Sequence, residues 1–306
     1  MNKFVKMLLM TVFLSVMIVG CRGNRDVPIV KAGLGIVTNE VAKDPEGHYL
    51  VNTTFAVVGL DKDGKIKDVA FDVAQCLPDH PGPVTQSKKD QKDSYGMKKA
   101  SSIGKEWHEQ IDAFETFCIG KTVDEVLAVD FVNDQQSDLK SSCTMAINDF
   151  QVALHKANEN AIDVQAQHVD VGYVMDLSKD VKTGYGVVET TVAMVASDNE
   201  GLISGCDIDV AHIVAMDKAD TRTNAEKRNE YGLKKHSSIH REWFEQVDGF
   251  EQTIQGMKAK DVERIATMNK DDQHMNVPKD GSDLSTKCTI DIGCFQKAVL
   301  NALKKR

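Results

Sequence analysis

An internal repeat of about 140 residues constrains the fold of this chain more than any other feature of its sequence. Residues 95–110 (YGMKKASSIGKEWHEQ) and residues 231–246 (YGLKKHSSIHREWFEQ) are identical at eleven of sixteen positions, at an offset of 136. Upstream, TTFAVV at 53–58 matches TTVAMV at 190–195 at an offset of 137. A unit of this length is far longer than a solenoid repeat, so the sequence predicts two tandem duplicated domains.

Each copy opens with a pattern typical of β-strands. Residues 49–60 alternate and are rich in β-branched and aromatic side chains, and a second alternating segment follows at 66–71 after the turn at Asp63-Gly64. This arrangement predicts a β-hairpin. Apolar stretches at Ala32–Val37 and Val171–Met175 predict a further strand in each copy.

Helical periodicity follows the strands in both copies. Residues 98–117 and 234–254 carry apolar side chains at three- and four-residue spacing, which predicts an amphipathic helix in each. Each expected helix ends before a glycine, Gly120 or Gly256. Shorter helices are expected after Thr122, at 149–158 and at 294–304.

Strands followed by helices in each copy predict an α+β fold. We expect each duplicated domain to be a small antiparallel sheet with flanking helices. A chain of 306 residues is long enough for two ordinary domains. We place the first at residues 31–163 and the second at residues 164–306.

The N-terminus has the features of an export leader. Two lysines precede an apolar run that is too short to span a membrane comfortably. The run ends at Cys21 in a sequence that resembles a bacterial lipobox, which implies that Cys21 is lipidated. We therefore expect a lipoprotein signal peptide at 1–20, a lipid-anchored tether at 21–30 and a chain held on the extracellular face of the cell membrane. A plain secretion signal or an anchor helix is the alternative.

Charge and cysteine content exclude some classes of function. The formal charge is -9, and it becomes -11 without the leader, which has two lysines and no acids. Nothing offers the clustered basic surface that nucleic acid requires, so no nucleic acid partner is expected. The cysteines and histidines have no zinc-site spacing, so no metal is expected. We expect the six cysteines after Cys21 to be small apolar filler rather than disulfide partners.

One seven-residue motif occurs once in each copy. Residues 138–144 read DLKSSCT and residues 283–289 read DLSTKCT. Each precedes an expected helix, where unpaired backbone N–H groups and the helix dipole favour a phosphate. Small neighbours would let a second molecule approach the final threonine, Thr144 or Thr289. From the residues alone, an ordinary helix cap is the alternative interpretation.

The motif resembles the acceptor sequence of FMN-binding domains of the NqrC and RnfG type, from bacterial redox pumps. In that family a flavin transferase moves FMN from FAD onto the last threonine as a phosphodiester. The repeat, the 95–110 segment and the lipobox are more closely similar to PplA-like flavin lipoproteins of extracellular electron transfer, over residues 21–306. Lipoproteins of that group are also described as pheromone precursors, because residues 13–20 of the leader could be released as a hydrophobic octapeptide.

The resemblance implies two covalent FMN groups, on Thr144 and Thr289, with the rest of each motif at the attachment site. The family usually has glycine or serine and then alanine before the threonine, whereas the second copy has Lys287 and a cysteine. This departure sets the second threonine apart from the first. The other motif residues implied in binding are Asp138, Ser141, Ser142, Cys143, Asp283, Thr286 and Cys288.

Repeat-matched residues outside the motif are candidates for contact with the flavin. Aromatic rings could stack on it, and a lysine could favour the reduced ring or the phosphate. Trp107 and Trp243 lie on apolar helix stripes and are also typical of a core, and Tyr-Gly before a helix is also typical of a turn. The matched candidates are Tyr95 and Tyr231, Met97 and Leu233, and Lys98 and Lys234.

The resemblance implies an extracellular flavoprotein that shuttles electrons rather than an enzyme with a dedicated substrate. Its implied partners are a flavin transferase, a membrane quinone-oxidising electron donor, extracellular electron acceptors and the membrane itself. Two alternatives stay open. One is a solute-binding or surface-interaction lipoprotein without flavin, and the other is an extracellular flavin reductase that acts on a small substrate.

Overall fold

The computed structural model describes residues 29–38, 41–44, 46–78, 85–130, 138–271 and 274–304. The expected signal peptide, the lipidation site at Cys21 and the tether up to Pro28 lie outside these residues. Within them, no helix has the length and apolar character needed to cross a bilayer.

The first sheet is antiparallel and is built mainly from the first copy of the repeat. Its order is β4-β3-β1-β5, and β2 extends the sheet beside the start of β3. The expected hairpin is confirmed, and Gly64 takes the left-handed conformation that its turn requires (φ 74°). The strands are β1 (Ile29–Val37), β2 (Val41–Lys43), β3 (Tyr49–Leu60), β4 (Ile66–Cys76) and β5 (Ile162–Ala166).

The second sheet has the order β6-β7-β8 and is also antiparallel. Its strands are β6 (His168–Lys179), β7 (Gly186–Ser197) and β8 (Ile203–Val214), and a two-stranded ribbon of β9 (Thr267–Met268) and β10 (Val277–Pro278) lies apart from it. The two sheets share one core, in which Phe55 and Val57 of β3 lie in the same cluster as Val192 and Met194 of β7. Strand β5 runs through the expected domain boundary at residue 163.

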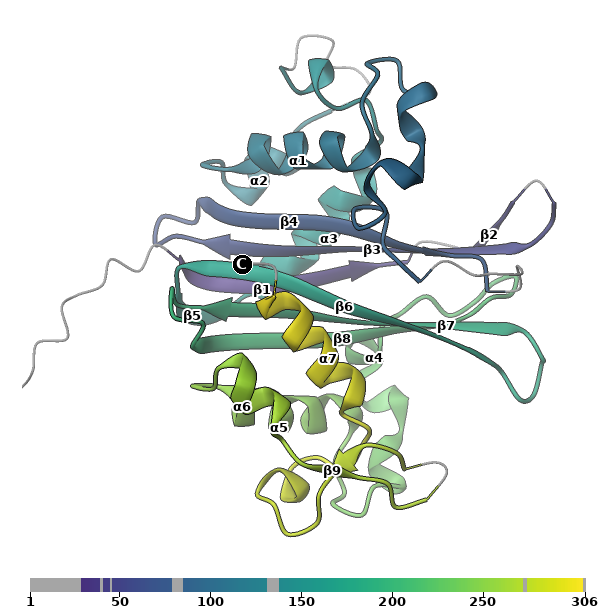
Figure 1. The fold of residues 1–306 in the computed structure, drawn as a ribbon, viewed down its shortest axis with the longest axis vertical. Coiled ribbons are helices and arrows are strands. Elements are labelled where there is room, and N and C mark those ends of the chain that lie inside the picture. The colour runs from purple at the N-terminus through teal and green to yellow at the C-terminus, as the bar shows by residue number, and fades with distance from the viewer. Residues whose placement is uncertain are drawn as a thin grey trace, which may run out of the picture.

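Helices cover the outer face of each sheet, so the molecule has four layers (Figure 1). Helices α1 and α3 pack on the first sheet, and α5 and α7 pack on the second. The predicted α+β fold is therefore confirmed. The helices are α1 (Trp107–Cys118), α2 (Val123–Leu127), α3 (Asn148–Glu159), α4 (Asn224–Lys227), α5 (Trp243–Ile254), α6 (Ala259–Glu263) and α7 (Gly293–Leu303).

Helices α1 and α5 begin nine residues later than the periodicity predicts. Residues 98–106 instead form a 3-10 turn and a loop before α1, and Gly104 there takes φ 64°. The Glu106 side chain accepts a hydrogen bond from the Met97 N–H at 2.8 Å, and the Glu106 N–H donates to Glu109 at 2.8 Å. These bonds fold the chain back at Glu106, so the helix starts after it.

Two glycines let a helix lie directly on a strand. A Cβ atom built on Gly35 of β1 would lie 2.0 Å from the backbone oxygen of Ala153 in α3. A Cβ atom on Gly172 of β6 would lie 1.9 Å from the backbone oxygen of Ala298 in α7. Both helices follow the seven-residue motif, so these contacts fix where each motif threonine sits.

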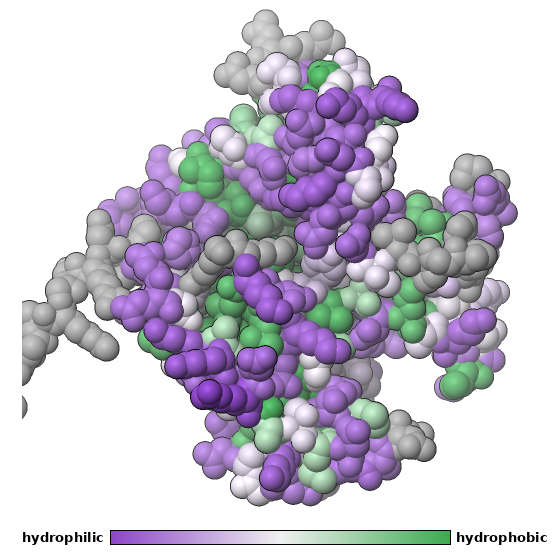
Figure 2. Space-filling view, in the orientation of Figure 1, coloured by the Kyte–Doolittle hydropathy of each residue, from purple (hydrophilic) through white to green (hydrophobic). Residues whose placement is uncertain are grey.

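Hydrophilic residues dominate the visible face of the molecule, and hydrophobic residues show mainly at the level of the sheets (Figure 2). Large exposed hydrophobic side chains are scattered along the described chain rather than grouped in one segment. They are Ile119, Val152, Val181, Tyr185, Leu202, Tyr231 and Met275. Single exposed residues of this kind are normal on a soluble surface.

Candidate functional site

Each motif folds as a tight turn that is fixed to the core by two apolar side chains. In the first copy the turn is η3 (Asp138–Ser141), and in the second it is η6 (Leu284–Thr286). The Cys143 N–H donates to the Leu139 oxygen at 2.7 Å, and the Cys288 N–H donates to the Leu284 oxygen at 2.8 Å. The leucine and cysteine side chains are buried in both copies, which confirms that these cysteines are core filler. The turn therefore presents the next residue, the threonine, outward.

A buried glutamine holds each motif threonine. The Gln110 Oε1 atom accepts hydrogen bonds from both the backbone N–H and the hydroxyl of Thr144, at 2.9 and 3.1 Å. Gln246 Oε1 accepts the same two bonds from Thr289, at 2.8 and 3.1 Å. Both glutamine residues are fully buried, while Thr144 is exposed and Thr289 is half-buried. Each hydroxyl thus points its proton inward and keeps its oxygen lone pairs available to another molecule.

The other end of each glutamine amide is also fixed. Gln110 Nε2 donates to the Ser101 hydroxyl at 3.0 Å and to the Lys105 backbone oxygen at 3.1 Å. Gln246 Nε2 makes the equivalent bonds to Ser237 and Arg241, at the same distances. These bonds orient the amide so that its oxygen faces the threonine. Sequence reasoning missed both glutamine residues, although each is the last identical residue of the repeated sixteen-residue segment.

Neither threonine is a helix cap. The N-cap residues of α3 and α7 are Ile147 and Ile292, three residues beyond the threonines, and neither helix has a side-chain cap bond. The cap interpretation of Thr144 and Thr289 is therefore wrong, because both hydroxyls bond a glutamine on another helix instead. It follows that each threonine lies in a short exposed segment between a 3-10 turn and a long helix.

The remaining motif residues support the turn rather than the threonine itself. The Ser142 hydroxyl donates to the Leu139 oxygen at 3.1 Å, and the Thr286 hydroxyl donates to the Asp283 oxygen at 2.7 Å. Ser141, Asp283 and Thr286 are exposed. Asp138 lies in η3, and its side chain is outside the described part of the structure.

The second copy accommodates Lys287 through a small residue on α5. Gly249 faces it so closely that a Cβ atom there would lie 2.8 Å from the Lys287 Cβ. At the matching positions the first copy has Ala113 and Ser142. The larger motif residue thus meets a smaller helix residue, and Thr289 keeps the same glutamine contacts as Thr144.

A pocket of about 270 Å³ is lined by Met145 and Ala146, the two residues that follow Thr144 in the chain, while Thr144 itself is not a lining residue. Three predicted residues also line it, namely Tyr95, Met97 and Trp107. The rings of Tyr95 and Trp107 lie edge to face with their centroids 6.4 Å apart. The other lining residues are Asn52, Thr54, Val73, Lys88, Asp149 and Phe150.

In the second copy the same aromatic pair recurs. The ring centroids of Tyr231 and Trp243 are 6.1 Å apart, and Leu233 packs beside the core of that half. Both tryptophan residues are buried, which confirms their core position, yet Trp107 also contributes to the pocket wall. Lys98 and Lys234 lie exposed on the 3-10 turns and are not lining residues of the Thr144 pocket.

One polar position that the sequence did not single out lies in the wall of the first pocket and has a matching position in the second copy. Lys88 lines the first pocket, with its Nζ atom 5.5 Å from the centre of the Tyr95 ring. Burial lowers the pKa of Lys88, and the charges of Asp72 and Asp149 oppose this effect. Its counterpart in the second copy is Asn224, which is buried and whose Oδ1 atom has no hydrogen-bond partner in the described structure.

These features fit a flavin. A flat ring system with polar edges suits the aromatic wall and the cation of the first pocket. The phosphate end would lie at the exposed threonine hydroxyl.

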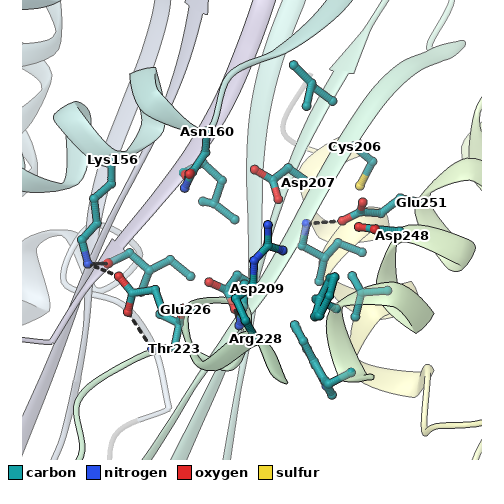
Figure 3. Close-up of a pocket in the computed structure, with 18 of the residues that line it drawn as sticks. Lys156, Asn160, Cys206, Asp207, Asp209, Thr223, Glu226, Arg228, Asp248 and Glu251 are labelled. Carbon is teal, nitrogen blue, oxygen red and sulfur yellow. Dashed lines mark hydrogen bonds and ion pairs between the residues drawn. The ribbon is translucent and has the colours of Figure 1, made fainter. Parts of the chain in front are cut away.

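A second cavity, of about 720 Å³, lies between the two halves of the chain (Figure 3). Its walls include five carboxylate residues of the second copy, namely Asp207, Asp209, Glu226, Asp248 and Glu251. Burial raises the pKa of Asp207 to about 7, and the charge of Asp209 adds to the rise. Burial and the charge of Asp207 also raise the pKa of Glu251. The motif threonines do not line this cavity.

The first copy has a different arrangement at the matching place. There Glu115 forms an ion pair with Lys89 at 2.7 Å, whereas the residue that matches Lys89 in the second copy is Ala225. Glu115 and Glu251 each accept a hydrogen bond from a backbone N–H of the adjacent strand, at 2.8 and 2.6 Å. Glu251 on α5 thus keeps the hydrogen bond to the adjacent strand, but it has no lysine at the position that Lys89 occupies in the first copy.

One group of possible metal ligands occurs in the described structure, at Asp44, Glu46 and His48. Asp44 accepts hydrogen bonds from the backbone N–H groups of Glu46 and His48, each at 2.9 Å. These bonds make the group a turn before β3, and Glu46 is exposed. The geometry is that of an acidic turn closed by its own carboxylate.

Comparison with known proteins gives one similar region. The chain is 33% identical over 116 residues to a chlorophenol reductase from Desulfitobacterium hafniense, and the match covers 31% of this chain and 36% of that protein. The chain therefore spans about a third of the length of this relative. No family model matches the sequence. No solved structure matches it either.

Proposed function

We propose that this protein is an electron-transfer flavoprotein that carries FMN covalently on Thr144 and Thr289. The observation that carries the proposal is the matched placement of the two threonines. In both halves a buried glutamine binds the backbone and the hydroxyl of the threonine, which is exposed at Thr144 and half-buried at Thr289. A threonine with only a structural role does not need a hydroxyl that another molecule can reach, whereas a threonine that accepts a transferred group does.

The attachment chemistry uses little of the chain itself. A flavin transferase would bring FAD, and the threonine oxygen would form a bond to the phosphorus of its FMN half while AMP leaves and the hydroxyl proton is lost. Gln110 and Gln246 hold the hydroxyl for this step, because each accepts a hydrogen bond from it and so restricts its rotation. Lys140 and Lys287, in the two motifs, are near in sequence and would attract the anionic phosphates.

Once attached, the flavin supplies the electron-carrying chemistry, and the protein orients the ring and excludes water from one side. Tyr95, Met97 and Trp107 form the wall that does this in the first half. A covalent link keeps the group in place without tight noncovalent binding. This property suits a protein that is lipid-anchored outside the cell, which is the localisation we propose on the basis of the leader and Cys21.

In this proposal electrons arrive from a quinone-oxidising donor in the membrane and leave to extracellular acceptors. The relative named as a chlorophenol reductase is consistent with redox chemistry in a similar region of sequence. Its name also favours a second candidate, an extracellular flavin reductase that acts directly on a small substrate. A solute-binding lipoprotein without flavin is the third, and the acidic cavity of Figure 3 is where it would bind a cationic solute.

Intact mass and in-gel fluorescence under denaturing conditions test the proposal. Full-length protein co-expressed with a flavin transferase should gain two FMN-sized additions. Thr144→Ala and Thr289→Ala should each remove one, and the double variant should remove both. An unmodified wild type under these conditions would refute covalent attachment. Flavin-loaded protein that reduces a small substrate over many turnovers, with an added electron donor and no further electron-carrier protein, would favour the reductase.

A further inference from the structure

The wall of the first pocket and the matching positions of the second copy share aromatic residues but differ in charge. Equivalent positions carry the same residue at five places along the wall of the Thr144 pocket, which means that the aromatic frame is common to both copies. These identical pairs are Thr54 and Thr191, Val73 and Val210, Tyr95 and Tyr231, Trp107 and Trp243, and Phe150 and Phe295. The polar positions are where the copies diverge.

In the first copy the wall has one cation and one carboxylate, Lys88 and Asp149, so its formal charge is zero. Both groups line the same pocket, and the charges of Asp72 and Asp149 act against the lowering of the Lys88 pKa by burial. Lys88 also faces the Tyr95 ring. A ring that entered this pocket would meet the ammonium group in a partly buried setting, where charges act strongly.

In the second copy the same positions have no cation. Asn224 replaces Lys88 and Cys294 replaces Asp149, while two carboxylates appear, at Glu189 and Asp291. Glu189 matches Asn52 of the first pocket wall, and its charge adds to the effect of burial in raising the pKa of Tyr231.

Each of these acids has a neighbour that fixes it. Glu189 accepts a bond from His212 at 2.9 Å, and Asp291 accepts one from the Gly293 N–H at 2.7 Å. The thiol of Cys294 donates to Asp176 at 2.9 Å, so a further carboxylate stands next to this position. Counted over matched wall positions alone, the first copy has one cation and one carboxylate and the second has two carboxylates, so the second is the more negative of the two.

We propose that the flavin on Thr144 has the higher reduction potential and the flavin on Thr289 the lower one, because Lys88 stabilises a reduced ring that Glu189 and Asp291 destabilise. Reduction adds two electrons and one or two protons to the ring, and it leaves an anion where only one proton is taken up. A cation beside the ring favours that form, and carboxylates oppose it. This inference rests on the proposed function.

Single-flavin proteins test the inference directly. Full-length Thr289→Ala and Thr144→Ala, co-expressed with a flavin transferase, should each carry one FMN, on Thr144 and on Thr289 respectively. Their potentials are measured by following the flavin absorbance during titration with dithionite in the presence of reference dyes. We expect Thr289→Ala to have the more positive midpoint potential. Equal midpoints, or the opposite order, would overturn the inference.

Charge exchanges then test the cause. Lys88→Asn in the Thr289→Ala background should lower the midpoint, and Glu189→Gln in the Thr144→Ala background should raise it. Lys62→Asn removes the same charge at an exposed hairpin turn, where Lys62 pairs with Asp63, and should leave both midpoints unchanged. A Lys88 variant that shifts the midpoint no more than the Lys62 variant would contradict the role of Lys88. If the variants carry FMN but have equal midpoint potentials, this inference alone is wrong. If intact mass shows no FMN on either variant, the proposed function is wrong as well.

Discussion

At the scale of single residues, the part of each candidate site that matters most is a glutamine rather than the motif itself. Gln110 and Gln246 are uncharged, buried and bonded at both ends of the amide. A buried amide that makes every one of these bonds has one stable orientation. The hydroxyl of Thr144 or Thr289, which bonds this amide, is consequently held in one rotamer when a transferase binds.

Replacement of Gln110 by leucine should slow attachment of FMN at Thr144 at least about tenfold. The variant loses the hydrogen bond that orients the hydroxyl, and one hydrogen bond corresponds to roughly this factor in rate. The rate of FMN mass gain is measured in the Thr289→Ala background with a purified flavin transferase. Gln246→Leu in that background should leave the rate unchanged, because Gln246 makes no hydrogen bond to Thr144 and instead serves the position of Thr289. Gln110→Glu keeps an acceptor oxygen and should restore part of the rate. A Gln110→Leu protein that is folded by circular dichroism and modified at the wild-type rate would contradict the role.

At the scale of elements, glycine determines how closely the helix after each motif approaches its sheet. Gly35→Ala and Gly172→Ala each place a methyl group about 2 Å from a helix backbone atom, which cannot move aside as a side chain can. We expect each to lower the free energy of unfolding by more than about 3 kcal/mol. Gly59→Ala is the matched control, because its nearest atoms belong to the side chains of Val169 and Ile29, and it should cost less. Urea denaturation measures all three, and equal losses would contradict this account.

Much of the element order follows from local sequence. The hairpin at Asp63-Gly64, the short helix capped by Thr122 and the helix from Asn148 lie close to their expected positions, because turn residues, caps and apolar spacing are local signals. The start of α1 does not follow from such signals. Residues 98–106 have helical composition, but the bond from Met97 to Glu106 is a contact across a loop that no spacing shows.

The same distinction between local signals and long-range contacts applies to the candidate site. The two threonines were identifiable because the motif is repeated and contiguous. Gln110 lies 34 residues before Thr144, and Lys88 lies further still, so their convergence depends on packing of α1 and of the loop after β4. The repeat did contain a signal for the glutamine, since an identical polar residue at the buried end of a helix stripe needs a partner.

At the scale of the whole molecule, the chain is organised around a core between its two sheets. Strand β3 is buried on both faces over most of its length, because α3 covers one face and the second sheet covers the other. Polar bonds also cross between the halves. The Tyr173 hydroxyl on β6 accepts from the Ser87 N–H at 2.7 Å and donates to Asp90 at 2.7 Å, and the Val169 N–H donates to Asp68 at 3.0 Å.

A shared core predicts that the two halves unfold together. Each half contains one of the two tryptophan residues of the chain, so Trp243→Phe leaves Trp107 to report on the first half and Trp107→Phe leaves Trp243 to report on the second. In each variant the urea midpoint from tryptophan fluorescence should coincide with the midpoint from far-ultraviolet circular dichroism, which follows the whole chain. Comparison within one variant removes the effect of the substitution on stability.

The shared core can be weakened from one side to sharpen this test. Met194 of β7 is fully buried in it, and Met194→Ala should cost about 2–5 kcal/mol. In the Trp243→Phe background this change, made in the second half, should lower the midpoint reported by Trp107 in the first half. Val262→Ala on α6 is the control, because Val262 belongs to the outer core of the second half. If the halves unfold separately, this change should affect the Trp107 midpoint less than Met194→Ala does. If they unfold together, it should also lower the Trp107 midpoint. A Trp107 midpoint that stays in place after Met194→Ala, while the circular dichroism midpoint falls, would show that the sheets touch without forming one cooperative unit.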